Sequence, residues 1–216
     1  MKCLITAGPT YEPLDEVRRL TNFSTGRLGT ELAEFLAARE HEVTLFRGEQ
    51  ATWTQQVKAE LVAFTTTSDL RERLKAAAAE NYDAVFHAAA VSDFAFGKVW
   101  QRSSAGELIP IKSGKISSRL DNLFAELVPT PKIVAELRDW YPKALLVGWK
   151  YEVDGNRETV ITQGRKQIAQ SRTNACVVNG PAYGQGFGVV SDGVRDCATK
   201  GDLFEELLSI FPKRAR

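Results

Sequence analysis

Short apolar runs alternate with helix-patterned segments over the first 90 residues, and this alternation limits the possible folds more than any other feature. The runs at 2–7 and 82–90 are predominantly apolar, as in strands that are buried on both faces of a parallel sheet. Further elements are expected as helices at 25–39 and 68–80 and as strands at 42–48 and 59–66. This order predicts an α/β fold with a doubly wound, mostly parallel, Rossmann-like sheet and helices on both faces.

The alternation stops between Phe94 and about Leu123, where glycines, a proline and several lysines are interspersed. Such a segment predicts a flap or hairpin insertion. Beyond it, helices are expected at 130–140, 157–170 and 202–210, strands at 144–152 and 175–179, and an edge hairpin at 183–192. Because no repeat or linker divides the chain, residues 1–216 are expected to form a single domain that carries the flap.

Composition and charge exclude several classes of protein. The 28 basic residues nearly balance the 27 acidic ones, so no net field attracts nucleic acid or an anionic membrane. No apolar run reaches the roughly 20 residues of a membrane helix, and no signal peptide precedes the first strand, so a cytoplasmic protein is expected. The three cysteines, none in a C-x-x-C pair, indicate buried free thiols. Metalloprotease and G-x-S-x-G hydrolase motifs do not occur.

The stretch 20–29, Leu-Thr-Asn-Phe-Ser-Thr-Gly-Arg-Leu-Gly, is a polar turn that opens a helix. The free backbone N–H groups and positive dipole of a helix start favour a phosphate-sized anion. Gly8 and Gly26 are too far apart for a dinucleotide fingerprint, and the long crossover leaves room for a substrate. Ser24 or Thr25 is expected to cap the helix.

The other strand ends are expected at the same edge of the sheet, where ligands of doubly wound folds bind. They are the segments 87–93, 148–152 and 179–181. Small residues there allow a base or ribose to approach the backbone, and the Asp93 carboxylate could hold a hydroxyl or a metal-bound phosphate. The alternatives are that Asp93 is a strand-exit cap and that His87 is a core histidine.

Structural interpretations of the remaining candidates also stay open. Gly26 and Gly29 are consistent with close packing of helix on sheet, and Asn22 with a turn that bonds its own backbone. Trp149 suits either packing or stacking on a base. Flap lysines are by default solvated charges.

These stretches resemble the phosphopantothenoylcysteine synthetase family, the ligase step of coenzyme A biosynthesis. Residues 4–18 are similar to its opening I-T-A-G-x-T-x-E-P-[IL]-D-x-V-R, and residues 20–29 to its [IL]-[ST]-N-x-S-[ST]-G-x-[ML]-G. The matches at 88–93 (A-A-V-[AS]-D), 114–118 (the flap) and 147–152 (V-G-F-x-x-E) are shorter. The resemblance runs from residue 4 to about residue 180.

The resemblance implies a two-step reaction. The carboxylate of 4′-phosphopantothenate attacks the α-phosphate of a nucleoside triphosphate, CTP rather than ATP in most bacteria, with Mg²⁺ present. The amine of cysteine then displaces the nucleoside monophosphate from the acyl-nucleotide. Such chemistry needs electrostatic clamps and positioning but no protein nucleophile. The resemblance also implies a homodimer and, in the pathway, a separate decarboxylase chain.

Site residues follow from the same resemblance. Asn22 and Lys115 would be catalytic, through contact with the substrate carbonyl and neutralisation of charge. The substrate phosphate would meet the turn Ser24, Thr25 and Gly26. The nucleotide would be bordered by Gly8, His87, Ala88, Ala89, Asp93, Pro131, Lys132, Ile133, Val134 and Trp149. No metal ligand is assigned.

The sequence departs from the family pattern at three places. Lys132 replaces an acidic residue, and Gln167 and Ser171 replace two helix lysines, although Lys166 and Arg172 are adjacent in sequence. The flap is long enough that its other lysine, Lys112, is an alternative to Lys115 for the catalytic role.

Two alternative functions remain: a paralogue that binds a nucleotide or pantothenate-like ligand without turnover, and an NAD(P)-linked oxidoreductase. The latter predicts an acid at the end of the second strand, which instead ends Phe-Arg-Gly.

Overall fold

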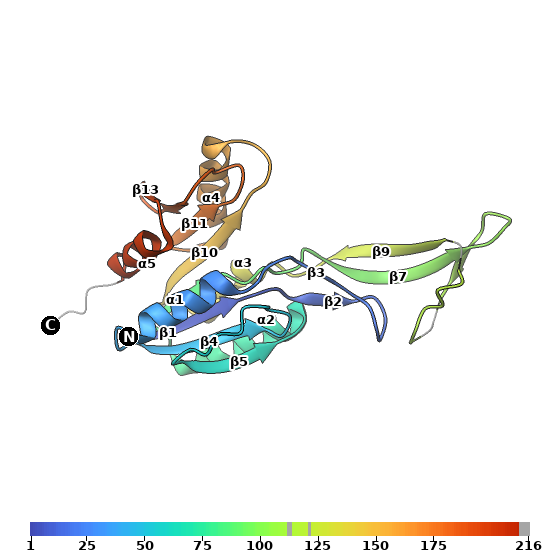
Figure 1. The fold of residues 1–216 in the computed structure, drawn as a ribbon, viewed down its shortest axis with the longest axis horizontal. Coiled ribbons are helices and arrows are strands. Elements are labelled where there is room, and N and C mark those ends of the chain that lie inside the picture. The colour runs from blue at the N-terminus through green and yellow to red at the C-terminus, as the bar shows by residue number, and fades with distance from the viewer. Residues whose placement is uncertain (112–113, 121, 212–216) are drawn as a thin grey trace.

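The protein has an α/β body from which a long arm of β-strands projects (Figure 1). The computed structural model describes residues 1–111, 114–120 and 122–211. The helices are α1 (Arg27–Ala37), α2 (Thr67–Ala77), the 3-10 helix η1 (Ala78–Glu80), α3 (Ile133–Trp140), α4 (Arg157–Ser171) and α5 (Lys200–Ser209). The strands of the body are β1 (Lys2–Ala7), β4 (Glu42–Gly48), β5 (Glu60–Phe64), β6 (Ala84–His87), β10 (Leu145–Tyr151), β11 (Ala175–Asn179), β12 (Phe187–Val190) and β13 (Val194–Cys197). The remaining strands are β2 (Tyr11–Pro13), β3 (Arg19–Thr21), β7 (Phe94–Arg102), β8 (Leu108–Pro110) and β9 (Leu123–Pro129).

The body is built on one eight-stranded sheet with the order β13-β12-β11-β10-β6-β1-β4-β5. The six strands from β11 to β5 are parallel, and β12 and β13 add an antiparallel edge. From β1 the chain builds outward through β4 and β5, then crosses to β6 and builds in the opposite direction. The predicted doubly wound α/β fold is confirmed, and its switch point lies between β1 and β6.

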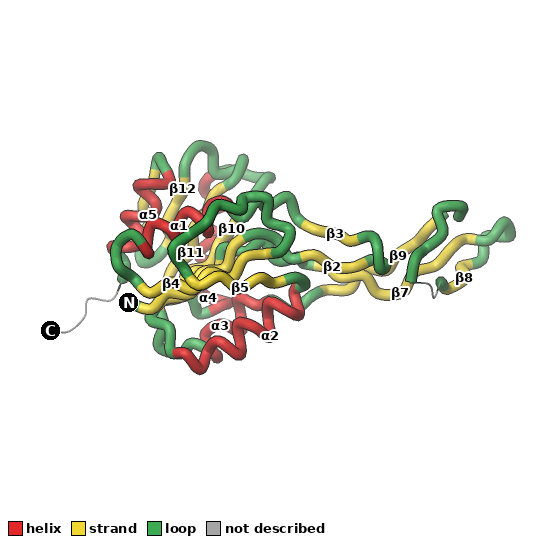
Figure 2. The backbone as a smooth tube through the Cα atoms, turned by 60° about the horizontal axis from the view of Figure 1, so that its bottom comes forward, coloured by secondary structure: helices red, strands yellow, loops and turns green. Residues whose placement is uncertain are grey.

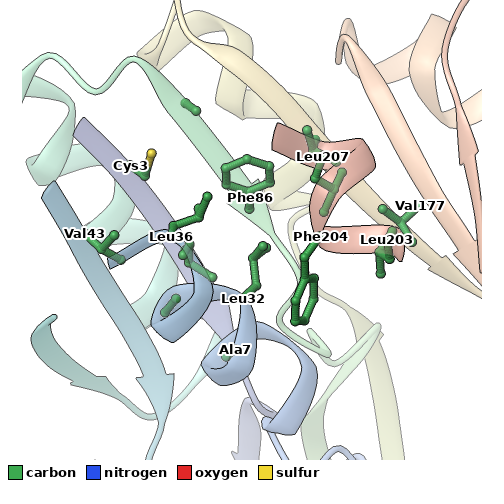
Figure 3. Close-up of a cluster of buried hydrophobic side chains, with 14 of the residues drawn as sticks. Cys3, Ala7, Leu32, Leu36, Val43, Phe86, Val177, Leu203, Phe204 and Leu207 are labelled. Atoms are coloured by element: carbon green, nitrogen blue, oxygen red, sulfur yellow. The ribbon is translucent and has the colours of Figure 1, made fainter. Parts of the chain in front are cut away.

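Helices cover both faces of this sheet (Figure 2). On one face α1 and α5 pack on a core in which Phe86 and Val177 meet Leu32 and Leu207 (Figure 3). On the other face α2, α3 and α4 cover side chains that alternate with these along the strands, such as Val85 and Val178. This alternation of neighbouring residues between two apolar layers explains the near-continuous apolar runs in the sequence.

The arm is a separate three-stranded antiparallel sheet with the order β8-β7-β9, and the β2–β3 hairpin lies beside it at its base (Figures 1 and 2). A register shift between Phe96 and Val99 interrupts the pairing of β7 with β9. The flap was predicted to end near Leu123. It is longer than that, because strand β9 extends it to Pro129. The β2–β3 pair was not predicted, because three-residue strands carry too little periodicity to be recognised.

Three other predicted boundaries are wrong. Strand β6 ends at His87, because the chain then turns and Ala90 bonds to Gly8 and Thr10 in the loop after β1. The edge hairpin comprises β12 and β13, at 187–197, since Gly184 and Gly186 have positive φ and form an irregular connection instead. Neither predicted hydroxyl residue caps α1; the cap is Gly26, with φ of 77°.

All three cysteines are buried and free, as predicted. Burial raises the pKa of Cys3 and Cys176 to about 12, so these thiols remain protonated and unreactive at neutral pH. Among the described helices, none has both the length and the apolar character needed to cross a bilayer.

Candidate active site at the switch point

The loops that follow β1 and β6 are bonded to each other at the switch point, where the strand order of the sheet reverses. Ala90 N–H donates to the Gly8 carbonyl at 2.9 Å, and Thr10 N–H donates to the Ala90 carbonyl at 3.2 Å. Gly8 adopts φ of 82°, and a side chain there would approach Ala51 Cβ to 2.9 Å. The loops after β1 and β6 are thus held together by main-chain bonds, which fixes the floor of any site above them.

A cavity of about 410 Å³ opens beside the carboxyl ends of β6 and β10, between α3 and α4. Eight of the ten predicted nucleotide residues line it, and Gly8 and Ala88 do not. The eight are His87, Ala89, Asp93, Pro131, Lys132, Ile133, Val134 and Trp149. Segments from three parts of the chain therefore converge on one hollow of a size suited to a small-molecule ligand.

His87 combines the two roles considered for it. It is 6% exposed, and its Nδ1 lies 2.9 Å from Thr6 Oγ1, so it is part of the folded interior. It also lines the cavity. Burial lowers the pKa of His87 to about 4, so the imidazole is neutral at physiological pH. A neutral imidazole offers a ligand one donor or one acceptor without charge.

Asp93 and Lys132 form an ion pair at the rim of the cavity, with side chains 65% and 67% exposed. Lys132 is also the N-cap residue of α3. Lys132, which stands where the family has an acid, therefore neutralises Asp93 locally. The pair is solvated and contributes little to stability.

Two N–H donors of cavity residues have no acceptor within the described structure: Trp149 Nε1 and Gln167 Nε2, both buried. Gln167 packs over Gly148 so closely that a Cβ on this glycine would lie 2.2 Å from Nε2. A buried donor without an acceptor costs about 1–3 kcal/mol. An acceptor oxygen on a ligand could offset that cost after a small side-chain adjustment.

The predicted phosphate turn lies at the start of α1. Ser24 Oγ accepts from Gly26 N–H at 3.4 Å, and Thr25 Oγ1 accepts from Arg27 N–H at 3.3 Å. A Cβ on Gly29 would approach Ala7 Cβ to 2.7 Å, so this glycine serves close packing of helix on sheet. Gly26 serves packing too, because a Cβ there would approach Ala51 Cβ to 2.9 Å.

Asn22 connects this turn to the cavity. Its Nδ2 donates to the Ala90 carbonyl at 3.1 Å, so the side chain bonds to the loop after β6 and not to its own turn. Ala89 in the same loop lines the cavity. Asn22 thus links the predicted phosphate turn to the loop that borders the cavity.

Lys115 lies on the arm and is not among the residues that line the cavity. Its neighbours dock on the 14–18 loop: Glu16 N–H donates to the Gly114 carbonyl at 2.9 Å, and Ile116 N–H donates to Asp15 Oδ2 at 3.1 Å. Burial pushes the pKa of Asp15 up, but three backbone N–H donors and the Arg18 guanidinium outweigh it and lower that pKa. The competing lysine, Lys112, lies outside the described residues.

Sequence reasoning missed part of the wall that α4 and β10 contribute. Lys150 follows Trp149 on β10, and Gln163 and Gln170 join Gln167 on the inner face of α4. Of the two basic residues beside the replaced lysines, Lys166 lines the cavity, whereas Arg172 pairs with Asp139. The helical spacing of the three glutamines is the signal that could have identified this face.

Two solved structures share this fold over nearly the whole chain. The DNA/pantothenate metabolism flavoprotein from Streptococcus pneumoniae has a TM-score of 0.83 and 26% identity, covering 97% of this chain and 97% of that chain. The C-terminal domain of the coenzyme A biosynthesis bifunctional protein CoaBC has a TM-score of 0.73 and 26% identity, covering 96% of this chain and 92% of that chain. The likeness extends to the arm as well as the body, since so little of either chain is left uncovered.

Among curated proteins, the coenzyme A biosynthesis bifunctional protein CoaBC of Thermococcus kodakarensis is 35% identical over 185 residues. These residues are 82% of this chain and 41% of that protein, so the chain spans less than half the length of that relative. The match confirms the resemblance that the motifs indicated. Since residues 1–206 match the family model, the chain belongs to the family described as the DNA/pantothenate metabolism flavoprotein C-terminal domain.

Proposed function

We propose that this protein is a phosphopantothenate–cysteine ligase. A carboxylate oxygen of 4′-phosphopantothenate attacks the α-phosphorus of CTP, forming an acyl-nucleotide and releasing pyrophosphate. The cysteine amine then attacks the acyl carbon, forming the amide and releasing CMP. A free carboxylate has no adequate leaving group, so consumption of a phosphoanhydride supplies one.

One observation carries the proposal: eight predicted nucleotide residues line a single cavity, and Asn22 bonds the loop that borders it. The turn Ser24–Gly26 follows Asn22 in the chain and would bind the phosphate of phosphopantothenate. With the nucleotide in the cavity, the reacting carboxylate would lie between them, near Asn22. Positioning of two bound anions is the main source of rate enhancement in such a site.

The nucleotide in this proposal carries Mg²⁺. Mg²⁺ commonly binds through one or two carboxylates together with substrate phosphates rather than in a protein cage. Among the described residues there is no group of three acidic, histidine or cysteine side chains that could hold a metal, and Asp93 is the carboxylate at the cavity. These residues fit a metal that arrives with the nucleotide, whose charge it would partly neutralise.

Assembly and location complete the proposal. Large apolar side chains on the arm are exposed: Phe94, Leu108, Ile109, Leu123, Phe124 and Leu127. An exposed apolar surface of this kind favours burial against a second copy, and so it supports a homodimer. A separate decarboxylase chain would supply the next step of the pathway, in the cytoplasm.

The decisive experiment mixes the protein with 4′-phosphopantothenate, cysteine, Mg²⁺ and either CTP or ATP. Pyrophosphate, nucleoside monophosphate and the amide product are expected in equal amounts, with CTP preferred. Without cysteine, pyrophosphate should appear in an amount equal to the enzyme, and monophosphate should not. If neither nucleotide yields pyrophosphate, the ligase proposal is wrong.

The replacement of two helix lysines by Gln167 and Ser171, both at the cavity, favours the second candidate, a binder without turnover. That protein would bind CTP or ATP in calorimetry and release no pyrophosphate. The family assignment lends no support to the oxidoreductase alternative.

Asn22→Ala is expected to lower kcat by about 100-fold, as loss of one oriented donor near a developing charge does. Asn122→Ala is the matched control, because Asn122 is an exposed residue of the arm just before β9. Equal activity of both variants would remove Asn22 from the catalytic centre.

Lys115 is proposed as the flap lysine that neutralises charge during activation. Because it lies on the arm, this role requires that the arm moves or that the arm of a second copy reaches the cavity. Mixing inactive Asn22→Ala and Lys115→Ala chains distinguishes the two, since recovery of about a quarter of the activity is expected only for action across subunits. Full activity of Lys115→Ala alone would exclude the role.

A further inference from the structure

We propose that Lys150 and Lys166 hold the polyphosphate chain of the nucleotide, one from strand β10 and one from helix α4. This inference rests on the proposed function for the presence of a nucleoside triphosphate. The sequence pattern assigned no role to Lys150, and it drew attention to Lys166 only as a neighbour of a replaced helix lysine. Both lysines line the cavity in the folded chain.

The charges of the cavity lining leave these two lysines as the excess. Three lysines and one carboxylate line the cavity, and the carboxylate of Asp93 is paired with Lys132. The lining therefore has a formal excess of two positive charges, on Lys150 and Lys166, although Glu152, outside the lining, pairs with Lys150. A polyanion is the ligand class that such an excess favours, whereas a nucleoside without phosphates gains nothing from it.

The two lysines come from elements that pack on each other. Gly148 of β10 faces α4, since it lies against the amide of Gln167. Lys150 is two residues further along the strand and so projects from the same face of the sheet. Lys166 precedes Gln167 on α4. A phosphate chain in the cavity would therefore have one cation on its strand side and one on its helix side.

Both ammonium groups are available to a ligand. Lys150 pairs with Glu152 at 2.8 Å, but its side chain is 38% exposed and Glu152 does not line the cavity. Such a solvated pair is weak, so a phosphate oxygen can compete for the ammonium group. Lys166 is exposed and forms no ion pair with any residue of the described ranges.

The other polar residues of the α4 wall carry no charge. Gln163, Gln167 and Gln170 offer amide N–H groups that can donate to phosphate oxygens. Amides add hydrogen bonds but do not neutralise a triphosphate. The electrostatic part of the affinity consequently depends on the two lysines.

The test is isothermal titration of the full chain with CTP and ATP, and with cytidine and adenosine as uncharged probes. Lys150→Ala and Lys166→Ala should each weaken triphosphate binding about tenfold, and the double variant about 100-fold, because each removes a charge-assisted contact. Nucleoside binding should change less than about twofold. The double variant should also show a weaker dependence of affinity on salt.

Control variants separate charge from general damage. Lys143 is exposed on the loop before β10 and does not line the cavity, so Lys143→Ala should leave affinity within about twofold. Lys150→Arg and Lys166→Arg keep the charge and should retain most of the binding. Gln170→Lys adds a cation to the α4 wall and should tighten triphosphate binding severalfold.

Triphosphate affinity of the double variant within about threefold of the wild type would overturn this inference, and so would an equal loss of nucleoside binding. Wild-type binding without release of pyrophosphate would overturn the ligase proposal but leave these lysine effects measurable. A wild-type chain that binds no triphosphate at millimolar concentration would overturn the inference together with the nucleotide part of the proposed function.

Discussion

The body and the arm are both built from β-strands, yet their side chains have opposite surroundings. In the body, every residue of β1 from Cys3 to Ala7 is buried, and helices cover both faces of the sheet. In the arm, six of the seven residues of β9 are exposed, including Phe124 and Leu127. The body therefore satisfies its apolar surface within one chain, whereas the arm does not. This difference is the observation on which the proposed contact of the arm with a second copy rests.

The largest expected difference between the regions concerns two glycines. A Cβ on Gly48, at the end of β4, would lie 2.3 Å from the Pro9 carbonyl oxygen, so Gly48→Ala should lower the free energy of unfolding by about 3 kcal/mol. Gly106→Ala in the arm meets no atom within 4 Å and should cost only about 1 kcal/mol, for its positive φ. Urea unfolding followed by circular dichroism measures both. Equal losses would contradict the contrast between a tightly packed body and an open arm.

Acid should weaken the body through His87. Above about pH 6.5, the ordinary histidine pKa, the imidazole is neutral in both folded and unfolded chains and the full stability is present. As the pH falls toward about 4, the pKa of His87 in the folded protein, the unfolded chain binds a proton that the folded chain does not. Stability should fall by about 3 kcal/mol over this range.

His87→Gln tests that origin, because it removes the titrating group. Unfolding free energies measured at several pH values should lose most of their slope between pH 6.5 and 4 in this variant. The same measurement on His41→Gln shows how much of the slope belongs to the other histidine of the chain. An unchanged slope in His87→Gln would assign the acid sensitivity to carboxylates instead.

A smaller effect is expected at the start of α4, which carries the cavity wall. Asn156 caps this helix by accepting from Thr159 N–H at 3.0 Å, and Thr159 Oγ1 accepts from Asn156 N–H at 2.8 Å. Asn156→Ala should reduce the free energy of unfolding by about 1 kcal/mol. Asn156→Asp, which can still cap, should cost much less in the same urea experiment. Equal costs would show that the cap is not the origin of the effect.

The smallest effect on monomer stability, but a large one on assembly, is expected from the arm. Phe124→Glu together with Leu127→Glu should convert the proposed dimer into a folded monomer in analytical ultracentrifugation. The unfolding free energy of the monomer should change by only about 0.5 kcal/mol, because both side chains are exposed. Val153→Glu, an exposed apolar residue of the body, is the control and should leave the dimer intact. A dimer that survives the arm variant would locate the contact elsewhere.

Local elements of the body were predictable from the sequence because their periodicity is strong. Strands 2–7, 42–48 and 175–179 match the prediction residue for residue. Helix α5 begins two residues earlier than expected, at Lys200, since its cap is Thr199. Predicted boundaries are wrong where main-chain hydrogen bonds to a distant loop end an element, as they do just after His87. The prediction was least accurate for the arm, since its exposed strands lack the apolar alternation that is typical of a half-buried sheet.

The candidate site divides in the same way. Motif matching identified eight of the 17 residues at the cavity, because short motifs follow strand ends and strand ends meet at one edge. It did not assign a role to Lys150, a variable position of the 147–152 motif, or to Gln163 and Gln170 of α4. The motif also associated Lys115 with the catalytic centre, whereas the folded chain holds its neighbours against the 14–18 loop.

By itself, the sequence determined the alternation of strands and helices, the buried thiols and the family, because these depend on local patterns of side chains. Only the tertiary structure decided which charges pair at the cavity, where Asn22 donates its hydrogen bond and that the arm projects from the body. The physical reason is that hydrogen bonds and ion pairs between residues distant in the chain depend on relative position. Hydrophobic periodicity constrains that position without fixing it.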